Sequence, residues 1–138
     1  MIWLNPVKVM LGSFELRNVS LVAVDRGARR LVEEWTDLGP HVGFVDVPEQ
    51  RVVVSISRHV VETETVAPKP GESHTLTFRS SAGLSAAGVR LVSIAVVVTS
   101  VEHAMTKGGR ATQSIRAVAV SSDGAADPVV ETLVEGEV

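Results

Sequence analysis

The chain has 138 residues, of which 45% are hydrophobic and 21% are charged, and its formal net charge at pH 7 is −3. This profile indicates one soluble globular domain and is too short for two full domains. Cysteine is absent, which excludes disulfides, thiolate metal sites and cysteine nucleophiles. Valine occupies 27 positions, whereas aromatic residues make up 4% of the chain. A core built from β-branched side chains favours strands over a helical bundle.

Export and membrane patterns are missing from the sequence. The N-terminus has no basic segment followed by a long apolar stretch, as a secretory signal would require. The longest apolar run, 91–101, is interrupted by serine and threonine and is far shorter than the roughly 20 residues of a membrane helix. We therefore expect no membrane insertion. Basic residues form no cluster, so sequence-specific nucleic-acid binding is not expected either.

The N-terminal region predicts a hairpin followed by a break. Apolar residues alternate over 7–11, Gly12-Ser13 suits a two-residue turn with glycine first, and the alternation resumes over 14–16. The apolar phase then shifts at Asn18, which predicts a bulge or a break there.

Residues 28–35 fit two different structures. The apolar positions suit a short amphipathic helix that Gly39-Pro40 would end. An extended strand is the alternative, because eight residues are too few for periodicity to decide. Trp35 is expected to be buried in this segment, and Trp3 is a candidate interface anchor.

The middle of the chain predicts three strands. A short one, 42–47, closes at Pro48, and 51–61 is the clearest half-buried strand because apolar and polar residues alternate along it. A proline-rich loop over 62–73 precedes a short strand around residues 76–78. A second connection of small residues covers 80–88.

The C-terminal half predicts a long hairpin and an acidic tail. Residues 90–105 and 110–120 are rich in β-formers and are joined across Lys107-Gly108-Gly109. The block 93–98 has no clean alternation, so it is either central between two layers or covered by another subunit. The residues after Arg116 include five acidic and no basic side chains, which predicts a short solvated tail over 129–138.

The predicted fold is mainly β: a β-sandwich or partly open barrel of about seven strands, with at most one short helix and a long C-terminal hairpin. A single domain is expected over 1–128.

No residue is predicted to be catalytic, to bind a cofactor or to hold a metal, and we do not expect an enzyme. The histidines, at positions 41, 59, 74 and 103, have none of the short spacings of metal ligands. Glu33 and Glu34 are adjacent and point in different directions, so they cannot form a facing carboxylate pair. The sequence contains no Gly-x-Ser-x-Gly elbow. The segment 123–128 lacks the ligand pattern and closing glutamate of an EF-hand loop and is read as a turn.

Three segments together resemble tail tube proteins of tailed bacteriophages, particularly those with contractile tails. They are 35–40 (WTDLGP), 44–51 (FVDVPEQR) and the closing hairpin with the turn that follows it, 98–128. The resemblance covers nearly the whole chain. It implies a small β-sandwich that joins neighbouring copies into hexameric rings, which stack into a hollow tube.

The resemblance also implies partners and a location. A tail sheath protein would surround the tube, a tape-measure protein and then DNA would occupy its lumen, and a baseplate would lie at its end. The protein would assemble in the host cytoplasm and reside in the virion. The acidic candidates for the lumen wall are Glu33, Glu34, Asp37, Glu62, Glu64 and Glu102. The loops 62–73 and 80–88 are candidates for contacts between rings or with the sheath. The alternative function is a small β-sandwich binding module, or a tail-terminator or baseplate component, that does not polymerise.

Overall fold

The computed structural model describes residues 4–60, 68–81, 89–108 and 111–134. These residues contain strands and no helix, which confirms the mainly β prediction. Within the described ranges there are eight strands, compared with the roughly seven that the sequence predicted: β1 (Leu4–Leu11), β2 (Phe14–Glu15), β3 (Val19–Trp35), β4 (Val42–Val60), β5 (Ser73–Ser81), β6 (Val89–Met105), β7 (Ala111–Ala119) and β8 (Val129–Val134).

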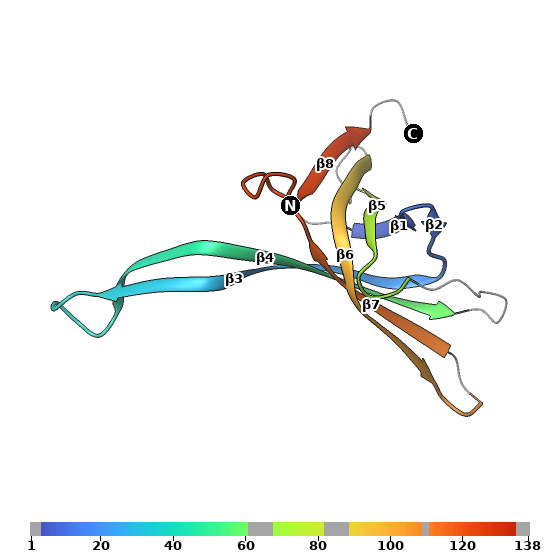
Figure 1. The fold of residues 1–138 in the computed structure, drawn as a ribbon, viewed down its shortest axis with the longest axis horizontal. Helices are drawn as coiled ribbons and strands as arrows, with labels where there is room; N and C mark the ends of the chain where they lie inside the picture. The colour runs from blue at the N-terminus through green and yellow to red at the C-terminus, as the bar shows by residue number, and fades with distance from the viewer. Residues whose placement is uncertain (1–3, 61–67, 82–88, 109–110, 135–138) are drawn as a thin grey trace.

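All eight strands belong to one antiparallel sheet (Figure 1). Their order is β2-β1-β5-β6-β7-β4-β3, and β8 pairs with β6 beside this path. The first half of β6 lies between β5 and β8, and its second half pairs with β7. The sheet curls until β1 comes into contact with β3 but does not close. This arrangement is the partly open form of the predicted barrel.

The inner face of the curled sheet holds the core. Alternate residues of β6 point inward, because Val92, Ile94, Val96 and Val98 are buried while the residues between them are more exposed. The register places Val98 opposite Ala117 of β7, which in turn lies opposite Val54 of β4. Burial therefore alternates from residue to residue along the block 93–98, although its sequence shows no clean alternation. Its inner face is covered by the curl of its own sheet, so it needs neither a second layer nor another subunit.

The N-terminal predictions are confirmed. Leu11 pairs with Phe14 across a turn at Gly12, whose φ of 63° lies in the left-handed region. Asn18 also has a positive φ, 57°, and separates β2 from β3 where the apolar phase shifts. Trp3 lies outside the described residues.

The strand alternative is correct for 28–35, and a helix there is wrong. Residues 28–35 are the outer half of β3 and pair with β4 as far as Trp35, opposite Val42. The two strands predicted over 42–61 are a single one, because β4 runs through Pro48. Proline is tolerated at this point because the register is irregular nearby and, among the described strands, only β3 pairs with that stretch of β4. Together the outer halves of β3 and β4 project from the body as a two-stranded ribbon (Figure 1).

The tail predicted over 129–138 is wrong for its first part. Residues 129–134 form β8, which pairs with 89–94 of β6. Val129 is buried in the core and Val130 is exposed, which is the alternation of a half-buried strand. The burial of this apolar face keeps the segment in the sheet despite its acidic composition. Residues 135–138 lie outside the described residues.

The predicted C-terminal hairpin is confirmed, since β6 and β7 pair as far as Met105 and Ala111 and Gly108 has a φ of 71°. The short strand expected around residues 76–78 is β5, which includes residues 80 and 81 of the predicted connection. Of the two predicted loops, 62–67 and 82–88 lie outside the described residues.

Candidate functional site: a projecting arm

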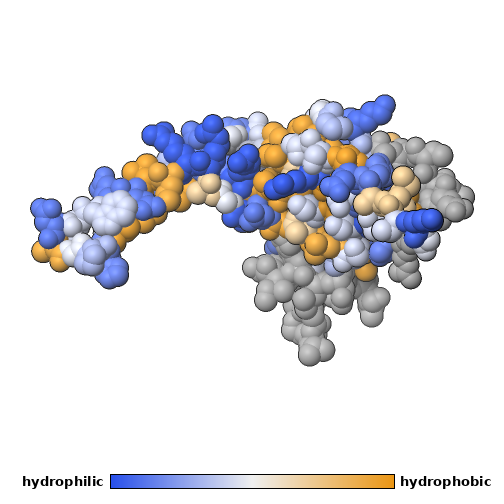
Figure 2. All heavy atoms as spheres, turned by 90° about the horizontal axis from the view of Figure 1, so that it is seen from below, coloured by the Kyte–Doolittle hydropathy of each residue, from blue (hydrophilic) through white to orange (hydrophobic). Residues whose placement is uncertain are grey.

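The ribbon formed by residues 28–50, here called the arm, is the most exposed apolar feature of the described residues. It consists of the outer half of β3, a turn at 36–41 and the outer half of β4. Of the twelve large hydrophobic side chains that are exposed in the described part of the chain, six belong to the arm: Leu31, Trp35, Leu38, Val42, Phe44 and Val45. Figure 2 shows hydrophobic and hydrophilic residues next to each other along the arm. Exposed apolar side chains gathered on one projection indicate an interaction surface.

The arm combines these apolar groups with negative charge. Residues 31–47, here called the arm tip, contain four carboxylates and no lysine or arginine. Three successive cross-strand pairs each place one carboxylate opposite one apolar side chain: Glu33 with Val45, Glu34 with Phe44, and Val32 with Asp46. Residues directly opposite each other share a face of the ribbon, and successive pairs alternate between faces. Both faces of the arm tip are therefore acidic and apolar at once.

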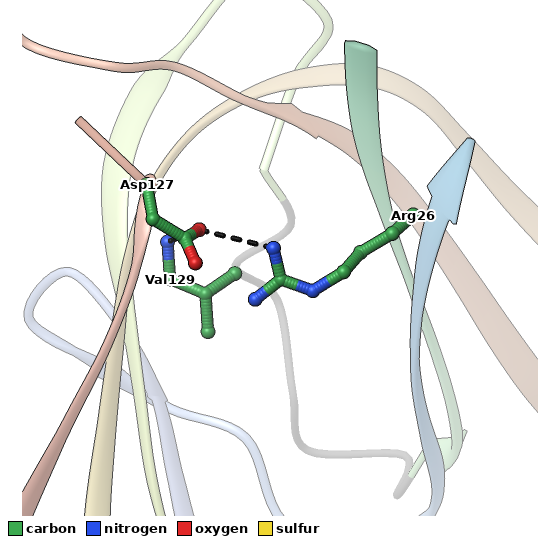
Figure 3. A network of polar contacts seen from close by, with 3 residues as sticks. All are labelled: Arg26, Asp127 and Val129. Carbon is green, nitrogen blue, oxygen red and sulfur yellow. Dashed lines mark hydrogen bonds and ion pairs between the residues drawn. The ribbon is translucent and has the colours of Figure 1, made fainter. Parts of the chain in front are cut away.

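Two ion pairs hold the base of the arm. Arg29 pairs with Glu49 across the two strands. Arg26, just before the arm, lies 3.1 Å from the carboxylate of Asp127 in the loop before β8 (Figure 3). This hydrogen bond, together with the one that Asp127 accepts from the Val129 amide, lowers the pKa of Asp127. Both ion pairs are exposed, so they orient the arm more than they stabilise the fold.

The turn at the end of the arm is closely packed. The amide of Leu38 donates to the hydroxyl of Thr36 at 3.4 Å. A Cβ atom added to Gly43 would lie 2.8 Å from the methyl group of Thr36, so a larger residue at position 43 requires the Thr36 side chain to move.

A groove lies at the base of the arm on the outer face of the sheet, and we call it the root groove. Its lining includes Asp25, Arg51, Val53, Thr99, Arg116 and Val118, which come from β3, β4, β6 and β7. Arg51 and Arg116 are both exposed, and no ion pair joins either of them to a carboxylate of the described residues. The two valines are half-buried between them.

The structure does not bring the four histidines together. His41 lies in the exposed turn of the arm, and His74 bonds to Glu72 with 3.0 Å between the ring nitrogen and the carboxylate. His59 is on β4, with a buried Nδ1 that has no hydrogen-bond partner among the described residues. His103 is on β6, 3.0 Å from Gln113. Within the described ranges, no group of three or more potential ligands could hold a metal ion.

The segment 123–128 is a turn, as the sequence predicted. Asp123 accepts hydrogen bonds from the amides of Ala125 and Ala126, both at 2.8 Å. Both hydrogen bonds favour the charged carboxylate and lower the pKa of Asp123, and the bond from the Ala126 amide has the larger effect. The carboxylate therefore caps its own turn.

A buried polar row at one end of the core was not predicted from the sequence. Arg58, although charged, is buried, and its Nε donates to the side-chain oxygen of Gln113 at 2.6 Å. Gln113 in turn contacts His103, so the row crosses β4, β7 and β6. The sequence contained one sign of this row: Arg58 occupies a position in the predicted strand 51–61 where the alternation calls for an apolar residue.

The acidic residues proposed for a lumen wall lie in different regions. Glu33, Glu34 and Asp37 are exposed on the arm, and Glu102 is exposed on β6. Glu62 and Glu64 lie outside the described residues.

Among the described residues, which contain no helix, no segment qualifies as a membrane-spanning helix. Comparison with protein-family models finds no match for this chain, and a search of curated proteins finds no relative.

Proposed function

We propose that this protein is a structural subunit that binds copies of itself, forming stacked hexameric rings that make the hollow inner tube of a bacteriophage tail. The observation that carries this proposal is the arm, whose tip exposes apolar side chains on a projection away from the core. A projection of this kind gains stability only when another surface covers it.

Unpaired strand edges support assembly as well. The outer half of β4 has β3 on one side, and among the described residues no strand pairs with its other side. The far side of β3 is also unpaired among the described strands. Exposed edges are templates for pairing with another chain. A contact between different surfaces of identical subunits closes into a ring or continues as a filament.

The phage context comes from the resemblance of segments 35–40, 44–51 and 98–128 to tail tube proteins. In this proposal a tail sheath protein, a tape-measure protein and a baseplate are partners, and DNA passes through the lumen without specific binding. The net charge of −3 suits such a channel, because like charge opposes adhesion of DNA to the wall.

The test is negative-stain electron microscopy of the purified protein over a concentration series. We expect rings or hollow tubes from the whole chain. A matched variant replaces residues 29–49 with an Asn-Gly turn, which connects the cross-strand neighbours Ala28 and Gln50 directly. This variant should keep the circular dichroism of a folded sheet and form no rings. A strictly monomeric parent protein would overturn the proposal. A small oligomer that does not polymerise would favour a binding module, a tail terminator or a baseplate component.

A further inference from the structure

We infer that the root groove is the receptor for the arm tip of a neighbouring copy of this chain. The inference rests on the proposed self-assembly and assigns the second surface that such an assembly needs. The arm tip supplies one side of the contact, and the groove between β3, β4, β6 and β7 supplies the other.

Charge is complementary between these two surfaces. The arm tip carries four carboxylates without a basic residue. The root groove presents the guanidinium groups of Arg51 and Arg116, which outnumber its single carboxylate, Asp25. Neither arginine has an ion-pair partner among the described residues, so both are available to a carboxylate from outside. Arginine binds carboxylates through two parallel hydrogen bonds, which adds orientation to attraction.

The apolar side chains of the arm tip and of the root groove are complementary as well. The root groove has Val53 and Val118 on its floor between the two arginines, and they lie directly opposite each other on β4 and β7. On the arm tip, Glu33 shares its pair with Val45 and Glu34 shares its pair with Phe44. Either face of the ribbon can therefore place an apolar side chain on the valine floor while its carboxylate meets an arginine. An apolar centre with a charged rim is the usual anatomy of a protein interface.

The two surfaces cannot meet within one molecule. Figure 1 shows the arm extending away from the body, with its tip far from its own base. Residues 28–35 alone span roughly 25 Å at the rise of an antiparallel strand. The contact therefore joins different surfaces of two copies, and the pair keeps one free groove on the first copy and one free tip on the second. This is the arrangement that propagates into rings or filaments.

A charge exchange tests this assignment. The groove variant R51E/R116E and the tip variant E33K/E34K should each raise the protein concentration needed for assembly at least about tenfold. An equimolar mixture of the two variants should recover assembly, because wild-type tips then meet wild-type grooves and lysine tips meet glutamate grooves. The matched controls are E15K and R17E, which reverse exposed charges outside the arm and groove and should assemble as the wild type does.

The readouts are sedimentation velocity for assembly and circular dichroism for folding. Assembly of either variant alone at wild-type concentrations would overturn the receptor assignment, and so would a mixture that fails to recover. In both cases the proposed function would stand as long as the wild type forms rings. A wild type that stays monomeric would overturn the proposed function and the inference together. For a second measurement that needs no variant, raising the salt concentration should weaken wild-type assembly, and indifference to salt would count against the charge pairing.

Discussion

The guanidinium of Arg26 lies 3.1 Å from the carboxylate of Asp127, a residue 101 positions later in the chain. The contact joins the base of the arm to the loop that leads into β8 (Figure 3). The same carboxylate oxygen accepts a hydrogen bond from the amide of Val129 at 3.0 Å, at the first residue of β8. One side chain therefore fixes both the start of the last strand and the base of the arm.

Replacing the two partners separately should have unequal effects. Asp127→Ala removes the acceptor of the Val129 amide as well as the ion pair, so we expect a loss of about 1–2 kcal/mol in the free energy of unfolding. Arg26→Ala removes only an exposed ion pair and should lower it by less than about 1 kcal/mol. Urea unfolding of both variants measures the difference. A larger loss for Arg26→Ala would show that the ion pair, and not the amide hydrogen bond, is the main contribution.

The pH dependence of this contribution follows from the lowered pKa of Asp127. The Arg26 guanidinium and then the Val129 amide favour the carboxylate, so the folded pKa lies below the ordinary value of 3.8. The stabilisation is complete above the unfolded pKa and is lost as the pH falls through the folded pKa. Asp127→Asn imitates the protonated side chain at every pH. Thermal melting should therefore separate wild type and Asp127→Asn at about pH 6, and the separation should shrink below pH 3.8. A separation that is constant down to strong acid would contradict this account.

The arm explains where prediction from the sequence succeeds and where it stops. In the body, one face of β4 is buried, so the alternation over 51–60 predicts the strand correctly. In the arm neither face is buried, and the register shifts between Ala28 and Val32 displace the apolar residues from strict alternation. The displaced pattern imitates the spacing of a helix. The same exposure places Trp35, predicted to be buried, 59% in solvent.

The root groove could not be predicted in the same way. Arg51 and Arg116 are separated by 65 positions and reach the same groove only because β4 pairs with β7 and the sheet curls. A single sequence shows which residues are charged but not which strands become neighbours. The buried Arg58 was visible as an exception to the alternation, whereas its partner Gln113 depends on the same pairing of β4 with β7.

Gly12 should resist substitution for two reasons. Its φ of 63° is unfavourable for any residue with a Cβ, and a Cβ there would lie 2.8 Å from Nδ1 of His74. We expect Gly12→Ala to lower the free energy of unfolding by about 1–2 kcal/mol or more. Gly27→Ala is the matched control, because nothing lies within 4 Å of its added Cβ and its φ is not in the left-handed region. Equal effects in chemical denaturation would contradict the strain at the Gly12 turn.

The buried polar row predicts a penalty for removing its central member. Gln113 is 1% exposed and accepts the hydrogen bond from Arg58 while contacting His103. Gln113→Leu has similar volume but deprives a buried guanidinium of one acceptor, so we expect a loss of about 1–3 kcal/mol. Ser114→Leu, at the exposed neighbouring position on β7, is the control and should change stability by less than about 0.5 kcal/mol. A neutral Gln113→Leu would mean that the row contributes nothing to stability.

Trp35 and Phe78 should separate folding from assembly. Phe78 is 1% exposed in the core, and Phe78→Ala should lower the free energy of unfolding by about 3–5 kcal/mol. Trp35 is 59% exposed on the arm, so Trp35→Ala should change it by less than about 1 kcal/mol. Exposed tryptophans at interfaces often contribute about 2 kcal/mol or more to binding, so Trp35→Ala should raise the concentration needed for ring formation at least tenfold. Urea unfolding and sedimentation velocity on the same samples measure both quantities. A Trp35→Ala variant that is as unstable as Phe78→Ala would place the tryptophan in the fold, and one that assembles like the wild type would remove it from the interface.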